Sequence, residues 1–216
     1  MAALPHLRDV SSWQGPIDWR AERRAGVRYV YCKVSQGTTY VDPTGARRIR
    51  NASWAGLHAG GYHFATPGVG SPEAQAARLL ELAPHRKGML RPCVDCEWNE
   101  HGLEPAALAA WYLGFVVSVH KRTGFWPAVY GSPSYLARFA VYHPDVFGRC
   151  PLWLADYGVA RPKVPAPWSH WAAWQWTDRR YDPAAGSRVD DSFVADAAAL
   201  LVPGPLARAR ARRRRA

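Results

Sequence analysis

The sequence of 216 residues lacks any apolar run long enough to cross a membrane, and it contains only four cysteines, which are widely scattered. A membrane-spanning helix needs about 20 consecutive apolar residues. The opening residues, MAALPHLRDV, have no long apolar segment, so they lack the pattern of a cleaved signal peptide. Small secreted domains held by disulfides have a much denser set of cysteines. The sequence therefore predicts neither a membrane protein nor a disulfide scaffold.

Acidic residues are also few, because 17 Asp and Glu stand against 28 Lys and Arg and leave a formal charge of +11. Six of the basic residues are arginines between positions 208 and 215; without them, 22 basic residues face 17 acidic ones, a charge of +5. We expect one domain over residues 1–203 and a basic, disordered tail over residues 204–216. Three explanations of the tail stay open: attraction to anionic cell-wall polymers, solvation of a chain end, and nucleic-acid binding. The body carries no nucleic-acid motif, so we do not expect a nucleic-acid partner.

Aromatic side chains, in contrast, are abundant: the chain has 11 Trp and 10 Tyr and is 48% hydrophobic. A core of this size needs fewer of them. Surplus Trp and Tyr often line clefts, where flat rings stack on sugar faces, although core and interface positions are the alternative.

Strand-like apolar runs alternate with helical segments along the chain. The predicted strands cover residues 8–13, 27–35, 61–67, 91–98, 126–132, 151–158, 170–177 and 188–194. The predicted helices cover residues 17–26, 42–60, 71–84, 104–124, 133–142 and 196–201. The alternation favours a parallel sheet with helices outside, and eight strands favour a closed barrel over an open doubly wound sheet. Helices thin out in the last third, so we predict the α/β class with an irregular single-domain β/α barrel, similar to a TIM barrel.

The stretch RPCVDCEWNE at residues 91–100 admits two interpretations, a metal or redox motif on Cys93 and Cys96 or a pair of catalytic carboxylates. Side chains alternate between the two faces of a strand, so the two cysteines point in opposite directions. No second cysteine pair has the spacing of a zinc site. We therefore expect no metal site and no cofactor.

Asp95 and Glu97 share one face of this predicted strand. Acids in a strand interior are unfavourable unless they are used, and the inward face of a barrel strand opens into the active-site mouth at its C-terminal end. Glycoside hydrolysis needs two carboxyl groups with separated pKa values. Asp9 in the first strand and Asp190 in the last are expected to join them, since those strands are neighbours in a closed barrel. A salt-bridged structural pair at Asp95 and Glu97 remains the equal alternative.

Eight motifs in order carry a more specific resemblance. They are DVSSWQGPIDW, KVSQGTTYVDP, GGYHFATP, VDCEW, TGFWPAVYGSPSY, PLWLADYG, AAWQWT and VDDSFV, between Asp9 and Val194. Together they resemble the glycoside hydrolase family 25 lysozymes, which are N-acetylmuramidases. The resemblance covers nearly the whole chain outside the tail.

This resemblance implies an irregular β/α barrel that hydrolyses the β-1,4 bond between N-acetylmuramic acid and N-acetylglucosamine in peptidoglycan. It places Glu97 on the general acid and Asp95 on the carboxylate that assists at the anomeric centre, with either a protein nucleophile or the substrate's acetamido group. The supporting acids and the groove-lining residues are implied at Asp9, Asp190, Tyr62, Trp153, Tyr157 and Gln175. Two positions depart from the family: Ser12 replaces a common His, and Gln36 replaces a common Glu, which removes a charge near the mouth.

The predicted partner is the glycan strand of peptidoglycan, with anionic wall polymers as a further partner of the arginine tail. The alternative function is a catalytically inactive barrel that binds wall glycan. We expect a monomer of phage or actinobacterial type, made in the cytoplasm and released to the wall by a holin or from a virion.

Overall fold

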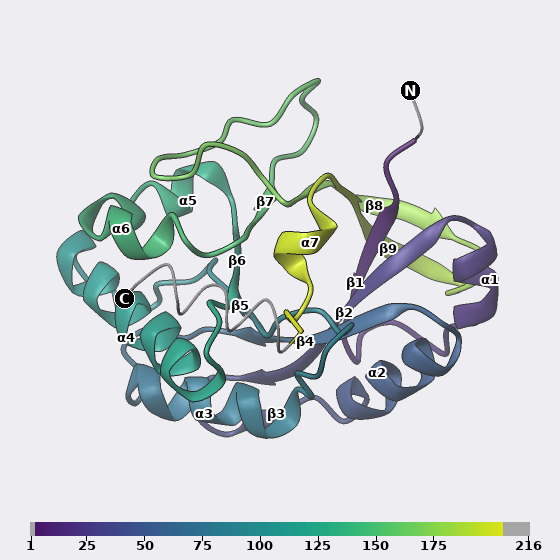
Figure 1. Ribbon diagram of the computed structural model, residues 1–216, viewed down its shortest axis with the longest axis horizontal. Coiled ribbons are helices and arrows are strands. Elements are labelled where there is room, and N and C mark those ends of the chain that lie inside the picture. The colour runs from purple at the N-terminus through teal and green to yellow at the C-terminus, as the bar shows by residue number, and fades with distance from the viewer. Residues whose placement is uncertain (1–2, 205–216) are drawn as a thin grey trace.

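The computed structural model describes residues 3–204 and shows eight strands closed into a barrel (Figure 1). In spatial order the strands are β1 (His6–Val10), β2 (Val27–Gln36), β4 (His58–Phe64), β5 (Cys93–Asp95), β6 (Ala128–Gly131), β7 (Leu152–Ala155), β8 (Ala173–Asp182) and β9 (Ser187–Val194). The ring closes because β1 pairs with both β2 and β9. A two-residue strand, β3 (Tyr40–Val41), pairs with the end of β2 and was not predicted. The predicted barrel is confirmed.

Strand direction differs from the prediction at one place. All neighbours from β1 round to β8 are parallel, but β9 runs antiparallel to both β8 and β1. Four residues, 183–186, join β8 to β9, whereas a parallel crossover needs about a dozen or more. The expectation of an all-parallel sheet is therefore wrong at the last strand.

The helices cover the first half of the barrel more fully than the second (Figure 1). The early helices are α1 (Trp19–Arg24), α2 (Gly45–Trp54), α3 (Pro72–Leu82) and α4 (Pro105–Thr123). The later ones are one-turn pieces: α5 (Pro133–Leu136), the 3₁₀ turn Ala140–Tyr142, α6 (Pro144–Phe147) and α7 (Ala197–Leu200). The predicted thinning of helices is confirmed, although α6 was missed. Within residues 3–204, no helix combines the length and apolarity that a bilayer span requires.

Two apolar layers hold the barrel together. Inside it, the rings of Tyr31 and Trp153 stack with centroids 4.9 Å apart, and Tyr130 packs against the same indole at 4.5 Å. The larger layer lies between the strands and the helices. Cys93 belongs to the inner layer and Cys96 to the outer one, so the two thiols point apart as predicted. All four cysteines are buried and free.

Several predicted boundaries were wrong, and one of them affects the site. The helix predicted over 42–60 ends at Trp54, because Gly56 takes a left-handed φ of +83° before β4 begins. The strand predicted over 91–98 is only Cys93–Asp95, so Glu97 lies in the loop that follows. Of the predicted tail, residues 205–216 lie outside the described part of the chain.

Candidate active site

The four predicted acids meet at one end of the barrel. Asp9 lies near the end of β1, and Asp95 is the last residue of β5. The carboxyl ends of parallel barrel strands form the mouth where such sites are built. Asp190 reaches the same place from the antiparallel strand β9, where it is the register partner of Asp9. Glu97 follows Asp95 by two residues. The charge of Asp190 acts on Asp95, and that of Asp95 acts on Asp9, so both pairs belong to one mouth.

Asp9 and Asp190 form a proton-sharing pair. Burial, followed by the charge of Asp190, raises the pKa of Asp9 well above its usual range. A hydrogen bond between the two carboxyl groups further raises the pKa of Asp9 and lowers that of Asp190. Burial raises the pKa of Asp190 as well, so the two carboxyl groups share a proton. Two adjacent carboxyl groups that cannot both ionise behave in this way.

Asp95 is the most isolated of the acids. Its residue is 6% exposed, and its Oδ1 atom is buried without a hydrogen-bond partner. Burial raises the pKa of Asp95 well above its usual range, and the charge of Glu97 raises it further, while Lys33 opposes both. A buried carboxylate oxygen without a donor is costly, so this side chain is not placed for stability.

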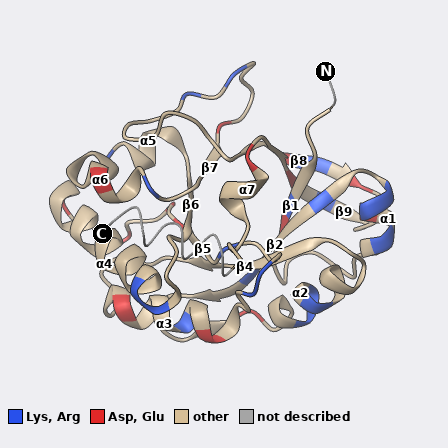
Figure 2. Cartoon of the chain, viewed as in Figure 1, with Lys and Arg blue, Asp and Glu red and all other residues tan. Residues whose placement is uncertain are grey.

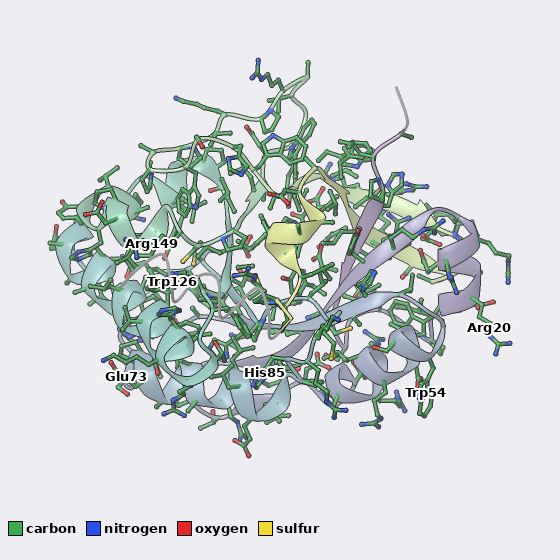
Figure 3. All side chains as sticks on the ribbon, viewed as in Figure 1. Arg20, Trp54, Glu73, His85, Trp126 and Arg149 are labelled. Carbon is green, nitrogen blue, oxygen red and sulfur yellow. The ribbon has the colours of Figure 1, made fainter. Side chains whose placement is uncertain are left out.

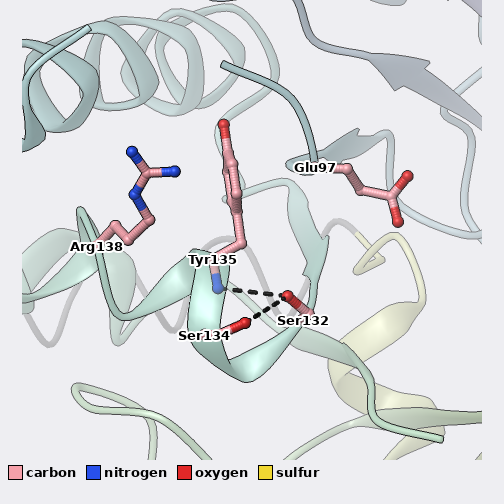
Figure 4. A pocket seen from close by; sticks show the side chains of 5 residues that line it. All are labelled: Glu97, Ser132, Ser134, Tyr135 and Arg138. Atoms are coloured by element: carbon pink, nitrogen blue, oxygen red, sulfur yellow. Dashed lines mark hydrogen bonds between the residues drawn. The ribbon is translucent and has the colours of Figure 1, made fainter. Parts of the chain in front are cut away.

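Glu97 lies at the surface of a hollow of about 320 Å³, which is also lined by Ser132, Ser134, Tyr135 and Arg138 (Figure 4). Surrounding protein raises the pKa of Glu97 above its usual range, while the Tyr130 hydroxyl and Lys33 act in the opposite direction. A carboxylic acid that keeps its proton and still reaches solvent is suited to proton donation.

The loop that carries Glu97 is fixed from the other side of the hollow. The Tyr135 hydroxyl donates a hydrogen bond of 2.6 Å to the carbonyl oxygen of Trp98. Tyr135 is held in turn at the start of α5, where its backbone N–H donates to Ser132 Oγ at 3.3 Å (Figure 4). The Arg138 guanidinium lies over the Tyr135 ring, 5.6 Å from its centroid. One wall of the hollow therefore consists of hydroxyl groups and a cation.

A hydrogen-bond chain links the two acid pairs. The Tyr130 hydroxyl donates to Gln175 Oε1 at 2.7 Å, and the Tyr157 hydroxyl donates to the same oxygen. Gln175 Nε2 donates to Asp9 Oδ2 at 2.8 Å. The Tyr130 hydroxyl also lies close enough to Glu97 to lower its pKa, so Tyr130 and Gln175 lie between Glu97 and the pair Asp9 and Asp190.

The four residues expected to line the groove have different positions. Tyr157 is exposed at the mouth. Tyr62 is partly buried, and the charges of Asp9, Asp95 and Asp190 all act on its hydroxyl, so it lies among the acids. Gln175 is 1% exposed and reaches the groove only through its partners.

Trp153 requires a correction, because it does not line the groove. It is 2% exposed and fills the barrel interior, and its indole N–H donates to Ser192 Oγ at 3.1 Å. A sealed ring has no face free for a sugar.

Sequence reasoning missed two functional side chains, Lys33 and Tyr130. Lys33 Nζ donates to Gln36 Oε1 at 2.7 Å and lies 4.8 Å from the Phe64 ring centroid. Burial lowers the pKa of Lys33, while the charges of Asp95, Asp42 and Glu97 raise it. The signal was a lysine inside the otherwise apolar run VYCKVS. Because Gln36 is neutral, the Lys33 charge acts on Asp95 and Glu97 without an anion at position 36.

Exposed aromatic rings surround the mouth. Trp13 follows β1, Tyr40 follows β2, and Trp98 follows β5, and all three are exposed. The Trp98 ring packs edge-on to Phe64 with centroids 5.8 Å apart. Flat rings at a solvent-filled mouth suit the stacking of sugar rings. Within residues 3–204, no group of three His, Cys, Asp or Glu side chains is arranged to hold a metal ion.

Comparison with known proteins agrees with this geometry. The model of the family described as "Glycosyl hydrolases family 25" matches residues 8–185. Lysozyme M1 of Streptomyces globisporus is 31% identical over 202 residues, which cover 89% of this chain and 69% of that protein. The N,O-diacetylmuramidase of Chalaropsis sp is 30% identical over 79% of this chain and 86% of its own length. The crystal structure of the bacterial lysozyme from Streptomyces coelicolor aligns with a TM-score of 0.85 at 28% identity, covering 93% of this chain and 96% of that one.

Proposed function

Because the chain belongs to the family 25 glycosyl hydrolases, we infer that it is a lysozyme that cleaves the β-1,4 bond between N-acetylmuramic acid and N-acetylglucosamine in peptidoglycan. The observation that carries the assignment of roles is the convergence of four carboxyl groups, all with raised pKa values, at one barrel mouth. Such an arrangement weakens the fold at neutral pH and is useful only for chemistry.

Glu97 acts as the general acid in this proposal. Its carboxyl proton passes to the glycosidic oxygen as the bond between that oxygen and the anomeric carbon breaks. Glu97 is then left as a carboxylate. The Tyr130 hydroxyl has a single hydrogen to donate. While Glu97 is protonated, Tyr130 donates this hydrogen to Gln175. Once Glu97 has lost its proton, the hydroxyl can rotate and donate to Glu97 instead. Gln175 keeps the hydrogen bond from Tyr157 in the meantime.

Asp95 acts at the anomeric centre, where positive charge develops in the transition state. Asp95 acts here in its ionised form, which its raised pKa delays to higher pH. That carboxylate either bonds to the anomeric carbon directly or accepts the N–H of the substrate's acetamido group, whose oxygen then attacks. In the second half of the reaction, the Glu97 carboxylate removes a proton from water as the water oxygen bonds to the anomeric carbon. The bond from that carbon to the Asp95 oxygen, or to the acetamido oxygen, breaks at the same time, which restores both side chains.

Asp9 and Asp190 support this chemistry without contacting the reacting bond in our proposal. Their shared proton keeps one negative charge, rather than two, beside Asp95 and Glu97. Gln175 ties that pair to Tyr130 and so to Glu97. Tyr62 and Tyr157 present their rings and hydroxyl groups to the bound glycan.

Digestion of purified peptidoglycan, followed by identification of the new reducing ends, tests the function. Muramic acid at the new ends is the expected result. Glucosamine ends or cleaved peptides would refute the bond assignment. Binding of glycan without new ends would establish the alternative, an inactive wall-binding barrel. That alternative is disfavoured by the presence of both Asp95 and Glu97.

The remaining proposals concern release and anchoring. We propose that the enzyme reaches the wall after holin-type or virion-associated release, and that it acts as a monomer. We also propose that the arginine tail is attracted to anionic wall polymers, since six arginines lie between positions 208 and 215.

A further inference from the structure

A second charged surface lies at the opposite end of the barrel from the acids. It consists of Arg20, Arg23, Arg24, Arg28 and Trp54, and we refer to it as the basal arginine patch. The three arginines of α1 precede the start of β2, where Arg28 is the second residue. Trp54 ends α2, which returns along the barrel between the parallel strands β2 and β4. The patch therefore lies at the amino ends of the strands, away from the catalytic mouth.

The patch is hollowed on both sides of an exposed indole. Trp54 is 81% exposed. One hollow, of about 460 Å³, is lined by Arg20, Arg23, Arg24, Arg28, Trp54 and Ala55, a set that includes four cations and no acid. A second hollow, of about 300 Å³, shares Arg20 and Trp54 and adds Asp18, Asn51, Ile17 and Trp19. Arg20 and Trp54 lie close together in Figure 3, and Figure 2 shows the basic residues gathered on α1.

Two guanidinium groups of the patch are held by backbone carbonyl oxygens and not by carboxylates. Arg23 Nη1 donates to the Ala55 carbonyl at 3.1 Å, and Arg28 Nη1 donates to the Arg23 carbonyl at 2.8 Å. These contacts order the guanidinium groups without cancelling their charge. Within residues 3–204, none of the four arginines takes part in an ion pair.

Of the two acids nearest to the patch in sequence, Glu22 is turned away from it, and Asp18 lies in the smaller hollow beside Arg20, outside the lining of the larger one. Glu22 is buried and faces Arg8 Nε at 3.3 Å, on the inner side of α1. Asp18 caps α1 by accepting from the backbone N–H groups of Arg20 and Ala21 at 3.0 Å. The local field in the larger hollow is therefore strongly positive.

We propose that the basal arginine patch binds a polyanionic wall polymer of polyol-phosphate repeats. Guanidinium groups match phosphate oxygens in a two-pronged geometry, and the open indole face of Trp54 suits the carbon backbone of a polyol or sugar between phosphates. Single-stranded nucleic acid requires successive stacking rings, and the larger hollow presents one, so nucleic acid fits less well. The choice of a wall polymer rests on the proposed function. Binding here leaves the mouth free, so anchoring and cleavage can proceed together.

The test measures binding of synthetic poly(glycerol phosphate) to the full-length protein by calorimetry over a salt series. All proteins carry glutamine in place of the six tail arginines, so that the tail does not mask the patch. Arg20→Gln with Arg24→Gln, and separately Trp54→Ala, should each weaken binding by about tenfold. The control pairs Arg122→Gln with Arg149→Gln, which removes the same charge from exposed positions outside the patch and should change affinity less than twofold; Arg149 lies across the molecule in Figure 3.

Three results would overturn the proposal. Patch variants within twofold of the parent would show that the hollows are not used. An equal loss in the control would show that only total charge matters. Tighter binding of a single-stranded oligonucleotide with the same number of phosphates, lost in Trp54→Ala, would assign the patch to nucleic acid instead. Hydrolysis of polymer-free peptidoglycan by the patch variants should equal that of the parent. If the proposed lysozyme function is wrong, the parent will fail in this hydrolysis assay. If the proposed polymer binding by the patch is wrong, the calorimetry will show it.

Discussion

Replacing Asp95 by Asn should stabilise the protein at pH 8 while it removes activity. The carboxylate is almost fully buried and its Oδ1 atom has no donor. Leaving a buried polar group without a partner costs about 1–3 kcal/mol, and an ionised group lies at the upper end of that range. The amide has nearly the same volume and no charge. We therefore expect the free energy of unfolding to rise by about 1–3 kcal/mol at pH 8.

In a domain of this size, each kcal/mol shifts the midpoint of thermal unfolding by about 2–4 °C. The expected gain is therefore roughly 2–12 °C at pH 8, measured by circular dichroism. The size of this gain depends on pH. The pKa of Asp95 is raised in the folded state, so its contribution to stability is fully present below its unfolded pKa and is lost as the pH rises through the folded pKa. The difference between Asp95→Asn and the parent should therefore shrink towards pH 4.

Asp191 provides the matched control. It is also fully buried, but Arg180 Nη1 lies 2.5 Å from its Oδ2 and His6 Nδ1 lies 2.9 Å from its Oδ1, with Arg8 as a further partner. Asp191→Asn removes the anion shared by Arg8 and Arg180, and although Arg8 keeps Asp182 and Glu22 as partners, the substitution should lower the free energy of unfolding. The same substitution at two buried aspartates is thus expected to have opposite signs. A lower midpoint for Asp95→Asn at pH 8, or a gain of the same size at pH 4, would refute this reasoning.

The other predictions concern pH dependence and binding. Lys33→Met should move both limbs of the pH–rate profile to higher pH, because Lys33 lowers the pKa of the acid Glu97 and of the carboxylate Asp95; unmoved limbs would exclude Lys33 from the site. Tyr130→Phe should reduce kcat by about 10- to 100-fold and move the alkaline limb upward, since the hydroxyl lowers the pKa of Glu97 and stabilises its ionised form. Tyr157→Phe removes the other Gln175 donor and should leave that limb in place; equal shifts in both variants would contradict the proposed hydroxyl movement. Removal of residues 204–216 should weaken binding to purified walls and reduce its salt dependence in a pelleting assay, and unchanged binding would mean a passive tail.

The closed barrel was predictable because strand-helix alternation and eight apolar runs are properties of local sequence. Closure also predicted that the first and last strands are neighbours, and Asp9 and Asp190 are indeed register partners. The direction of β9 was less visible, since it depends on a connection of only four residues that the sequence shows as part of a loop.

Glu97 was predicted beside Asp95 for a reason that was only partly correct. The strand ends at Asp95, and the chain at Cys96 passes close to Gly131, where a Cβ atom would lie 2.6 Å from the Cys96 carbonyl oxygen. The position of Glu97 therefore depends on a close backbone approach between β6 and the loop after β5. A single-strand pattern contains no information on such a contact. The glycine in the run VYGS was the available signal.

Trp153 shows the limit of a role implied by resemblance to a family. The resemblance places Trp153 in the groove, but the inner face of a barrel includes both a filled interior and an open mouth. Stacking on Tyr31 places the indole in the filled part. Lys33 was also missed at the level of sequence. Its charge lowers the pKa of Asp95 and Glu97, and the sequence of β2 does not show which acids lie near that lysine.

The most direct test of the account compares two substrates with one variant, Glu97→Gln. Peptidoglycan has a poor leaving group that needs a proton, whereas an aryl glycoside of the same repeat with a dinitrophenyl leaving group does not. The measurement is the initial release of product, before water attack becomes limiting. We expect a loss of about 10²- to 10⁴-fold on peptidoglycan and less than about tenfold on the aryl glycoside. Equal losses on both substrates, or retained cleavage of peptidoglycan, would show that Glu97 is not the proton donor.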